Sequence, residues 1–267
     1  MDTAFLFPIY ILENFDKVWT FILIFIRFVA MMVFIPGLGG GAMGLRIRIP
    51  AIMVMTFVSC STSATASLPT EWGGIVASMF SELLFGMMLG IIPAMSIAGV
   101  QTAMQLSSTT MGLSAGQMYD PSMGSTTTSL GLLCGNLCIC FFLLLGGHHY
   151  VLYAASGLGG EIVPGSFLVT ETGVRLIINR MGTIFEAGAL ISAPVIVAIL
   201  LTKFVMGLIS RAVPQVNIFI IAFPLTIGIG LIITALSLPE ICTYIEEDFR
   251  KVESEIVVIT EDTARAP

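Results

Sequence analysis

Long hydrophobic stretches separated by short polar joints set the pattern of this chain. Six of them reach or approach the roughly 20 apolar residues that a membrane-spanning helix needs. They cover residues 18–36, 49–68, 72–106, 128–155, 183–205 and 212–239. The third and the sixth are long and contain Pro93 and Pro224, so we expect these two to be kinked or split. The pattern therefore predicts about six long apolar helical segments.

A different pattern follows the sixth stretch. Apolar residues recur there at three- and four-residue steps, which is the spacing of one helix face. These positions are Ile241, Ile245, Phe249, Val252, Ile256 and Ile259. The residues between them are mostly polar and many are acidic. Residues 241–259 are therefore predicted to form a C-terminal amphipathic helix that carries an acidic tail.

Composition places these helices in a membrane. Hydrophobic residues make up 56% of the 267 residues and charged residues only 10%, and the mean hydropathy is +0.99. Soluble domains carry about 25% charged residues, and the period-two alternation of a transmembrane barrel is missing. We therefore predict an all-α fold, a polytopic helical membrane protein. The net charge of −6, concentrated near the C-terminus, argues against nucleic acid as a partner.

Several polar and small residues interrupt the hydrophobic stretches. Arg27 lies in the first stretch, Glu82 in the third and Glu186 in the fifth. Gly86 and Gly90 follow Glu82 at four-residue steps, and their segment "GMMLG" has the spacing that lets two helix backbones approach closely. These features predict helices that pack against protein or water over much of their surface.

The residues that could carry chemistry do not form a recognisable catalytic or metal site. Cys134, Cys138 and Cys140 lie in "CGNLCIC", which is not a zinc spacing, so we expect small buried hydrophobes. His148 and His149 are adjacent, and adjacent side chains on a helix do not converge on one metal. We interpret them as structural or helix-end histidines, with a proton relay as the alternative. The sequence thus predicts neither an enzyme nor a cofactor.

The joint between the third and fourth stretches, residues 107–127, has an unusual composition. The segment "MGLSAGQMYDPSMGSTTTS", residues 111–129, covers most of this joint, is rich in glycine, serine and methionine and carries one charge, Asp120, directly before Pro121. Asp-Pro favours an extended or turn conformation, and methionine side chains adapt to varied shapes. From the residues alone, two interpretations stay open: an ordinary loop between helices, or a loop that lines or gates a pore.

The sixth stretch begins with a polar group, in "SRAVPQVNIFIIAFP". Arg211, Gln215 and Asn217 surround Pro214, whose position suits a helix start. The amides can hydrogen-bond a neighbouring chain, or the segment can anchor a helix at the membrane border with a snorkelling arginine. Composition alone leaves both interpretations open.

The region from Ser192 to Leu236, "SAPVIVAILLTKFVMGLISRAVPQVNIFIIAFPLTIGIGLIITAL", resembles the signature region of the FliR/SctT family of type III protein export membrane proteins. An arginine followed by Pro-Gln-x-Asn-x-Phe and Phe-Pro-Leu-Thr carries the similarity. Supporting matches are Glu82 with "GMMLG", the pair Asp120-Pro121 and the "GGH" that ends at His148, so the resemblance covers nearly the whole chain. "FPLTIGIGL" resembles the flagellar members more than the injectisome branch.

The resemblance implies a division of the chain and a set of partners. Residues 1–165 are expected to form a FliP-like N-terminal helical part with a plug loop at 105–127, and residues 166–267 a FliQ-like C-terminal helical hairpin with the acidic tail. The implied partners are FliP-like and FliQ-like subunits, FlhB-like and FlhA-like export proteins, and unfolded protein substrates in transit. The implied location is the bacterial inner membrane at the flagellar basal body, and the distribution of basic residues favours a cytoplasmic C-terminus.

Two groups of candidate residues follow from the resemblance. The plug or gate group comprises Gln105, Met111, Gly112, Gly116, Met118, Asp120, Pro121 and Met123. The assembly-interface group comprises Glu82, Gly86, Gly90, Arg211, Pro214, Gln215, Asn217, Phe219 and Pro224.

The function that the sequence predicts is a non-enzymatic subunit of the flagellar type III export gate, which helps to form and plug the channel for unfolded substrates. Three alternatives remain at this stage. The chain can be an injectisome export subunit or a purely structural scaffold. It can also be a self-contained proton-coupled secondary transporter, in which Glu82, Glu186 and the two histidines relay protons.

Overall fold

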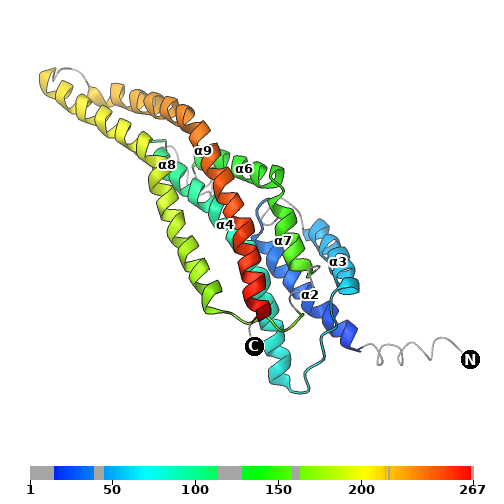
Figure 1. Cartoon of the computed structure of the whole chain (residues 1–267). Helices are drawn as coiled ribbons and strands as arrows, with labels where there is room; N and C mark the ends of the chain where they lie inside the picture. Colours follow the sequence, from blue (N-terminus) through cyan, green and yellow to red (C-terminus); the bar gives the residue numbers. More distant parts are fainter. Residues whose placement is uncertain are drawn as a thin grey trace, which may run out of the picture. The chain divides into compact units, whose positions relative to one another are not determined.

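The described part of the protein is built from α-helices. The structure, a computed structural model, describes residues 15–38, 45–113, 128–157, 163–213, 215 and 217–265. Its helices, in chain order, are α2 (Phe15–Phe34), α3 (Leu45–Thr62), α4 (Trp72–Met111), α6 (Ser129–Leu144), α7 (Gly147–Ser156), α8 (Glu171–Ala212) and α9 (Ile218–Arg265) (Figure 1). No strand occurs within these ranges, and the predicted all-α class is confirmed.

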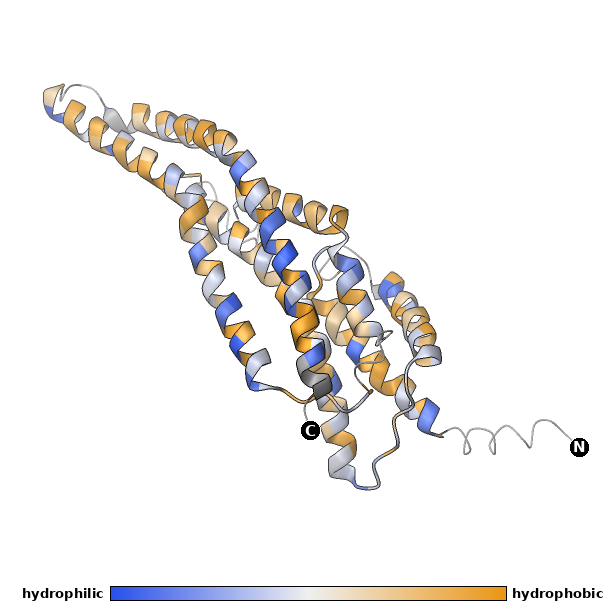
Figure 2. Ribbon diagram, viewed as in Figure 1, coloured by the Kyte–Doolittle hydropathy of each residue, from blue (hydrophilic) through white to orange (hydrophobic). Residues whose placement is uncertain are grey.

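Four helices of the described residues are long and apolar enough to cross a membrane. They are α2, α4, α8 and the part of α9 from Ile220 to Glu261. The pair α6–α7, bent by 63° at its break, adds a fifth candidate if it counts as one broken span. Figure 2 shows that hydrophobic residues dominate the adjoining ends of α8 and α9, whereas hydrophilic residues are frequent farther along α9. The prediction of a polytopic helical membrane protein is confirmed.

The predicted and observed helices differ mainly at their breaks. α4 runs past the expected end at residue 106 to Met111, and α9 joins the sixth stretch and the amphipathic segment into one helix. Neither Pro93 nor Pro224 splits its helix, so of the two expected outcomes, a kink or a split, the split does not occur at these prolines. The break falls instead at Gly146, whose φ of 73° is a conformation that glycine adopts without steric strain.

The second helix is also shorter than the hydrophobic pattern predicts. α3 ends at Thr62, and an extended coil follows over residues 64–69. The Thr20 hydroxyl accepts the N–H of Ala66 at 2.9 Å, and the Asp16 carboxylate accepts that of Leu68 at 3.2 Å. Serine and threonine compete with the helix for backbone hydrogen bonds. The run "SCSTSATAS" therefore ends α3, and polar side chains of α2 supply partners for the coil.

The helices belong to two compact units, and the chain enters each of them more than once. Unit 1 consists of Met1–Ala94, Phe142–Asn179 and Phe249–Pro267, and unit 2 of Met95–Phe141 and Arg180–Asp248. The division at residue 165, which rests on resemblance to two other proteins, concerns sequence ancestry rather than compactness and stays a prediction.

In unit 1, α2 packs against α3 and α7 and, along another face, against the first half of α4. The α2–α4 contact is very close at two glycines. A Cβ on Gly86 would overlap the carbonyl oxygen of Arg27, and a Cβ on Gly90 would lie 2.7 Å from that of Met31. "GMMLG" thus brings two helix backbones together within the chain, as the GxxxG spacing predicts.

In unit 2, the parts of α8 and α9 that belong to it form an antiparallel hairpin. Arg180 near one end of this segment of α8 pairs with Asp248 of α9. Farther toward the connecting turn, the buried Val195 of α8 packs with Ile233 of α9. The two helices lie side by side along this length (Figure 1).

The apolar stripe predicted for the C-terminal helix is confirmed. All six of its positions between Ile241 and Ile259 are buried, with exposed fractions of 7% or less. The stripe is continuous with the apolar part of α9 because no helix break separates the two.

Gly86→Ala is expected to destabilise the protein by about 1–3 kcal/mol, the usual range for over-packing a close contact. The added methyl group would meet the Arg27 carbonyl oxygen, which belongs to helix backbone and cannot turn aside. Gly73→Ala on the same helix is the matched control, because a Cβ there meets nothing within 4 Å. Thermal unfolding of the detergent-solubilised protein measures both variants. Equal melting temperatures would contradict the close packing of α4 on α2.

Candidate functional site

The loop that follows α4 leaves the helix through a well-defined end. Gly112, the first residue after α4, has a φ of 93°. Its N–H lies 3.2 Å from the carbonyl oxygen of Thr109, and the N–H of Leu113 lies 3.0 Å from that of Ser108. This pair of bonds is a Schellman motif, which satisfies two of the four carbonyls that a helix end leaves without partners. The direction in which the loop starts is therefore fixed by backbone hydrogen bonds.

Side chains of the α8–α9 hairpin bond the other two carbonyls. Lys203 of α8 donates from Nζ to the carbonyl oxygen of Thr110 at 3.0 Å. The Thr226 hydroxyl of α9 lies within hydrogen-bond distance of the carbonyl oxygen of Met111, at 3.2 Å, and shares its proton with that of Phe223 in its own helix, at 3.0 Å. A cation at the C-terminal end of a helix also interacts favourably with the helix dipole. Each of the last four carbonyls of α4 thus has a partner.

Apolar contacts hold the same helix end. The side chain of Met111 is 1% exposed and packs with Ile199 of α8. It lies directly against Gly230 of α9, where a Cβ would stand 2.5 Å from Met111 Cγ. Beside it, the ring of Phe223 lies 3.1 Å from the place that a Cβ on Gly112 would occupy. Gly230 leaves room for Met111, and Gly112 leaves room for Phe223. A larger residue at either glycine would displace the neighbouring side chain.

Gln105 holds the far end of the loop. Its Oε1 accepts the N–H of Thr128 at 3.0 Å. The Thr128 hydroxyl accepts the N–H of Gly131 at 3.3 Å, as the N-cap of α6. The residue that starts α6 is therefore tied back to α4, and α4 fixes both ends of the loop.

These contacts show where three of the predicted gate residues lie. Gln105 and Met111 lie inside α4 and Gly112 directly after it, so these three form the roots of the loop. The other predicted gate residues lie outside the described residues: Gly116, Met118, Asp120, Pro121 and Met123. Their gating role stays a prediction.

A buried ion pair joins α2 and α4 in unit 1. Arg27 donates from Nε to Glu82 Oε2 at 2.6 Å and from Nη2 to Oε1 at 2.9 Å, and the two side chains are 1% and 0% exposed. Arg27 Nη1 donates to the carbonyl oxygen of Ala155 in α7 at 3.2 Å, and the N–H of Gly165 donates to Glu82 at 2.6 Å. The guanidinium also lies 4.8 Å from the ring centroid of Phe85, within cation–π range. Four segments of unit 1 meet at this pair.

Three members of the predicted interface group therefore have contacts inside the chain. Glu82 is fully buried against Arg27, and Gly86 and Gly90 lie against the backbone of α2. A Glu82 carboxylate that accepts three hydrogen bonds and is shielded from solvent is held in place, which does not favour the proton-relay alternative. No contact with another chain is needed to account for these residues.

The remaining members of the interface group lie around the turn between α8 and α9. Four of them are exposed: Arg211, Gln215, Asn217 and Pro224. Pro214 and the side chain of Phe219 lie outside the described residues. The exposure of the four is compatible with either interpretation of this segment, and their part in an interface stays a prediction.

A second buried ion pair, in unit 2, does not stand out in the sequence. Arg180 Nη1 donates to the two carboxylate oxygens of Asp248 at 2.7 and 2.9 Å and to Ser96 Oγ at 3.2 Å. The Arg180 side chain is 3% exposed and that of Asp248 11%. The spacing contains a signal that could have revealed it. Asp248 follows Ile245 by three residues and precedes Val252 by four, which puts a carboxylate on the apolar face of the helix.

The cysteines and histidines form no cluster that could hold a metal ion among the residues that the structure describes. Cys134 and Cys138 are buried, as predicted for small hydrophobes, while Cys140 is exposed. His148 and His149 lie at the start of α7 with ring centroids 4.0 Å apart. Their position next to the helix break agrees with the prediction of helix-end histidines.

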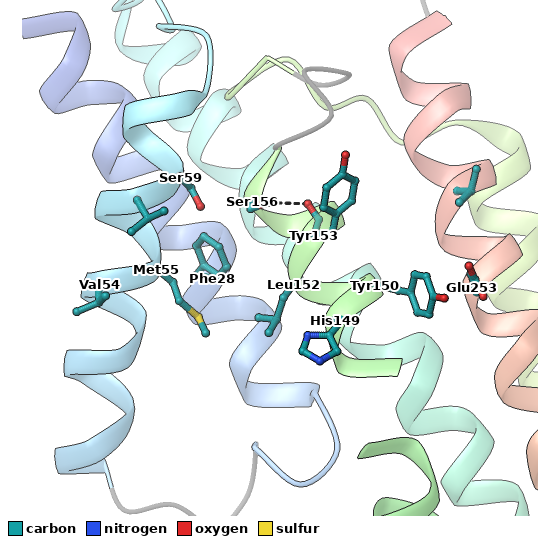
Figure 3. Close-up of a pocket in the computed structure, with 12 residues that line it drawn as sticks. Phe28, Val54, Met55, Ser59, His149, Tyr150, Leu152, Tyr153, Ser156 and Glu253 are labelled. Carbon is teal, nitrogen blue, oxygen red and sulfur yellow. Dashed lines mark hydrogen bonds between the residues drawn. The ribbon is translucent and has the colours of Figure 1, made fainter. Parts of the chain in front are cut away.

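A mostly apolar cavity of about 710 Å³ lies between α2, α3, α7 and the C-terminal turns of α9 in unit 1 (Figure 3). At its edge, Tyr150 of α7 and Glu253 of α9 face each other (Figure 3). The Ser156 hydroxyl in the lining donates to the carbonyl oxygen of Tyr153 at 2.7 Å.

The helices, the two buried ion pairs and the loop rooted on α4 are the features of a polytopic helical membrane protein. The chain belongs to the bacterial export proteins, family 1, whose family model matches residues 18–252.

Several individual proteins are similar over most of the chain. A flagellar biosynthetic protein FliR of Caulobacter vibrioides is 28% identical over 238 residues, which cover 88% of this chain and 94% of that protein. The FliR of Bacillus subtilis is 29% identical over 79% of this chain and 83% of its own length. The Yop proteins translocation protein T of Yersinia pestis is 24% identical over 79% of this chain and 82% of its own length. The resemblance to the FliR/SctT family is confirmed.

Glu82→Gln is expected to destabilise the protein by about 3–5 kcal/mol, because it leaves the buried Arg27 cation without its counter-charge. The control is Glu171→Gln, which breaks an ion pair with Arg175 whose side chains are 78% and 74% exposed. Exposed pairs contribute little, so no measurable change is expected there. Denaturant or thermal unfolding in detergent provides the comparison.

The double variant Arg27→Met/Glu82→Met is expected to recover part of the lost stability, since two apolar side chains need no counter-charge. If Glu82→Gln were as stable as Glu171→Gln, the central place of the buried pair in unit 1 would be wrong.

Proposed function

We propose that this chain is a non-enzymatic subunit of the flagellar type III protein export gate and helps to form and plug the channel for unfolded substrates. The observation that carries the proposal is the family membership over residues 18–252, together with FliR relatives that align over most of the chain. The FliR relatives are named for flagellar biosynthesis, which favours the flagellar system over an injectisome. Energy for export would come from other components.

The plug is the loop between α4 and α6, with Gly116, Met118, Asp120, Pro121 and Met123 as its candidate sealing residues. Two observations support this assignment. The loop carries adaptable methionines and a single charge. Its two ends are held on α4 by Gln105, Met111 and Gly112, as a loop that seals a pore at a fixed place requires.

The assembly surface includes the α8–α9 hairpin. Its exposed residues near the turn, Arg211, Gln215, Asn217 and Pro224, would contact FliP-like or FliQ-like subunits, with Pro214 and Phe219 beside them. Large apolar side chains of α8 are also exposed and need lipid or a protein partner to cover them: Val197, Leu200, Leu201, Phe204 and Leu208. FlhB-like and FlhA-like export proteins are further partners of the assembled gate.

Glu82, Gly86 and Gly90 are proposed to act inside the subunit, by holding the shape that is presented to its neighbours. Residues 1–165 would correspond to a FliP-like part and 166–267 to a FliQ-like hairpin. The location would be the bacterial inner membrane at the flagellar basal body, with the C-terminus in the cytoplasm, because more of the basic residues then lie on the cytoplasmic side.

Shortening the loop within residues 114–127, while keeping its roots, is expected to make cells leak ions, because the seal of the pore is removed. Ion flux is measured in cells that express the complete export complex and is divided by the amount of assembled complex. A truncation within the acidic tail after Glu261 is the control and leaves the flux unchanged. An assembled deletion complex with normal ion flux would contradict the plug assignment.

Photo-crosslinking side chains placed at Gln215 or Asn217 are expected to join this chain to a FliP-like or FliQ-like subunit. Both side chains are exposed, so neither substitution disturbs packing in the chain. The same variants expressed without those subunits are the control and give no such product. A membrane-border anchor would label lipid and give no protein product in either case.

A further inference from the structure

We propose that Lys203 and Thr226 are positioning residues that form a releasable latch on the end of α4, through which the α8–α9 hairpin controls the start of the loop. The inference rests on the proposed function and deepens it by naming how the plug is held and released. All residues that carry it belong to unit 2.

The latch is specific because it completes the hydrogen bonding of a helix end. The backbone N–H groups of Gly112 and Leu113 donate to the carbonyl oxygens of Ser108 and Thr109. The carbonyls of Thr110 and Met111 depend on the hairpin, through Lys203 Nζ at 3.0 Å and Thr226 Oγ1 at 3.2 Å. One donor comes from α8 and one from α9, so both arms of the hairpin hold the same helix end.

The latch can open without leaving a buried donor unbonded. The Thr226 hydroxyl lies 3.0 Å from the carbonyl oxygen of Phe223 in its own helix and 3.2 Å from that of Met111, so its single proton is shared and keeps an acceptor when α4 is released. Lys203 is exposed, and its ammonium group can turn to water or to a phosphate group of lipid. Release of α4 therefore costs the two donors little, in contrast to the buried and fully bonded ion pair of Arg27.

The packing of the Met111 side chain between α8 and α9 is the third contact of the latch. This side chain is buried between α8 and α9, and Gly230 leaves the space that it occupies. A displacement of the hairpin by a partner would change this space and the two hydrogen bonds together. The hairpin can thus pass a change in its surroundings to the first residues of the loop.

Thr226→Val tests the hydrogen bond with almost no change in volume. Thr234→Val is its matched control, since Thr234 is a similarly buried threonine of α9 whose hydroxyl bonds only Gly230 of its own helix. We expect Thr226→Val to raise ion flux per assembled complex by about five- to tenfold, because the loss of one hydrogen bond shifts an open–closed equilibrium by roughly that factor. Thr234→Val and the hydroxyl-preserving Thr226→Ser leave the flux at the wild-type level.

Lys203→Met and Gly230→Ala test the other two contacts of the latch, the Lys203 hydrogen bond and the packing of Met111. Lys203→Met removes the cation and keeps an apolar stem, and Lys203→Arg is expected to restore the closed state. Gly230→Ala pushes on Met111, while Gly228→Ala on the same helix meets nothing within 4 Å. We expect a raised flux for Lys203→Met and Gly230→Ala and none for Lys203→Arg and Gly228→Ala.

The outcomes separate the latch from the proposed function. If loop shortening raises ion flux but Thr226→Val and Lys203→Met do not, the latch is wrong and the plug stands. If Thr226→Val lowers only the amount of complex, with unchanged flux per complex, the residue is merely structural and the latch is again overturned. If loop shortening itself has no effect, the proposed function fails, whatever the latch variants do.

Discussion

The bidentate ion pair between Arg27 and Glu82 determines how unit 1 is assembled. Neither side chain is accessible to solvent, so each must find all of its partners in protein. Those partners come from α7, through Ala155, and from the turn at Gly165. Because Gly86 follows Glu82 by one helical turn, the bond also fixes the register in which α4 can lie directly on the backbone of α2. The packing of four segments thus depends on one carboxylate and one guanidinium.

Polar groups away from water must also be hydrogen-bonded at the end of α4, but the bonds there stabilise the structure less than the ion pair does. There the groups are backbone carbonyls rather than charges, and a net hydrogen bond contributes only about 1 kcal/mol. Each unit contains a buried ion pair whose separation is expensive, Arg27–Glu82 in unit 1 and Arg180–Asp248 in unit 2. The end of α4 is held by weaker bonds, and the Thr226 hydroxyl there has an alternative acceptor.

The hydrophobic pattern was enough to predict the helices, the all-α class and the buried stripe of α9, because burial of apolar side chains dominates their energetics. It did not predict where helices end inside long apolar runs. The end of α3 depends on hydrogen bonds from Asp16 and Thr20, and the break before α7 depends on the dihedral angles of Gly146. Such features arise from tertiary partners that spacing along the chain does not reveal.

The candidate site was predicted in part, for the same reason. Glu82 and Arg27 were visible as charges in apolar segments, but the sequence does not say that they bond to each other. The family resemblance assigns Gln105 and Met111 to the plug or gate group, whereas the structure places them in the helix that holds the loop. Lys203 and Thr226 are ordinary residues of apolar helices, and only their position opposite the last carbonyls of α4 makes them distinctive.

The unbroken course of α9 has a consequence for where this protein can lie. A helix of 48 residues, at about 1.5 Å per residue, measures roughly 70 Å along its path, and the hydrocarbon layer is about 30 Å thick. Even a strongly tilted α9 therefore keeps a large part of its length outside the lipid tails. The 40 residues of α4 and the 42 of α8 lead to the same conclusion. The number of apolar helices therefore overstates how much of this molecule lies inside the bilayer. The apolar surface of these helices that lies beyond the lipid tails has to be covered by protein.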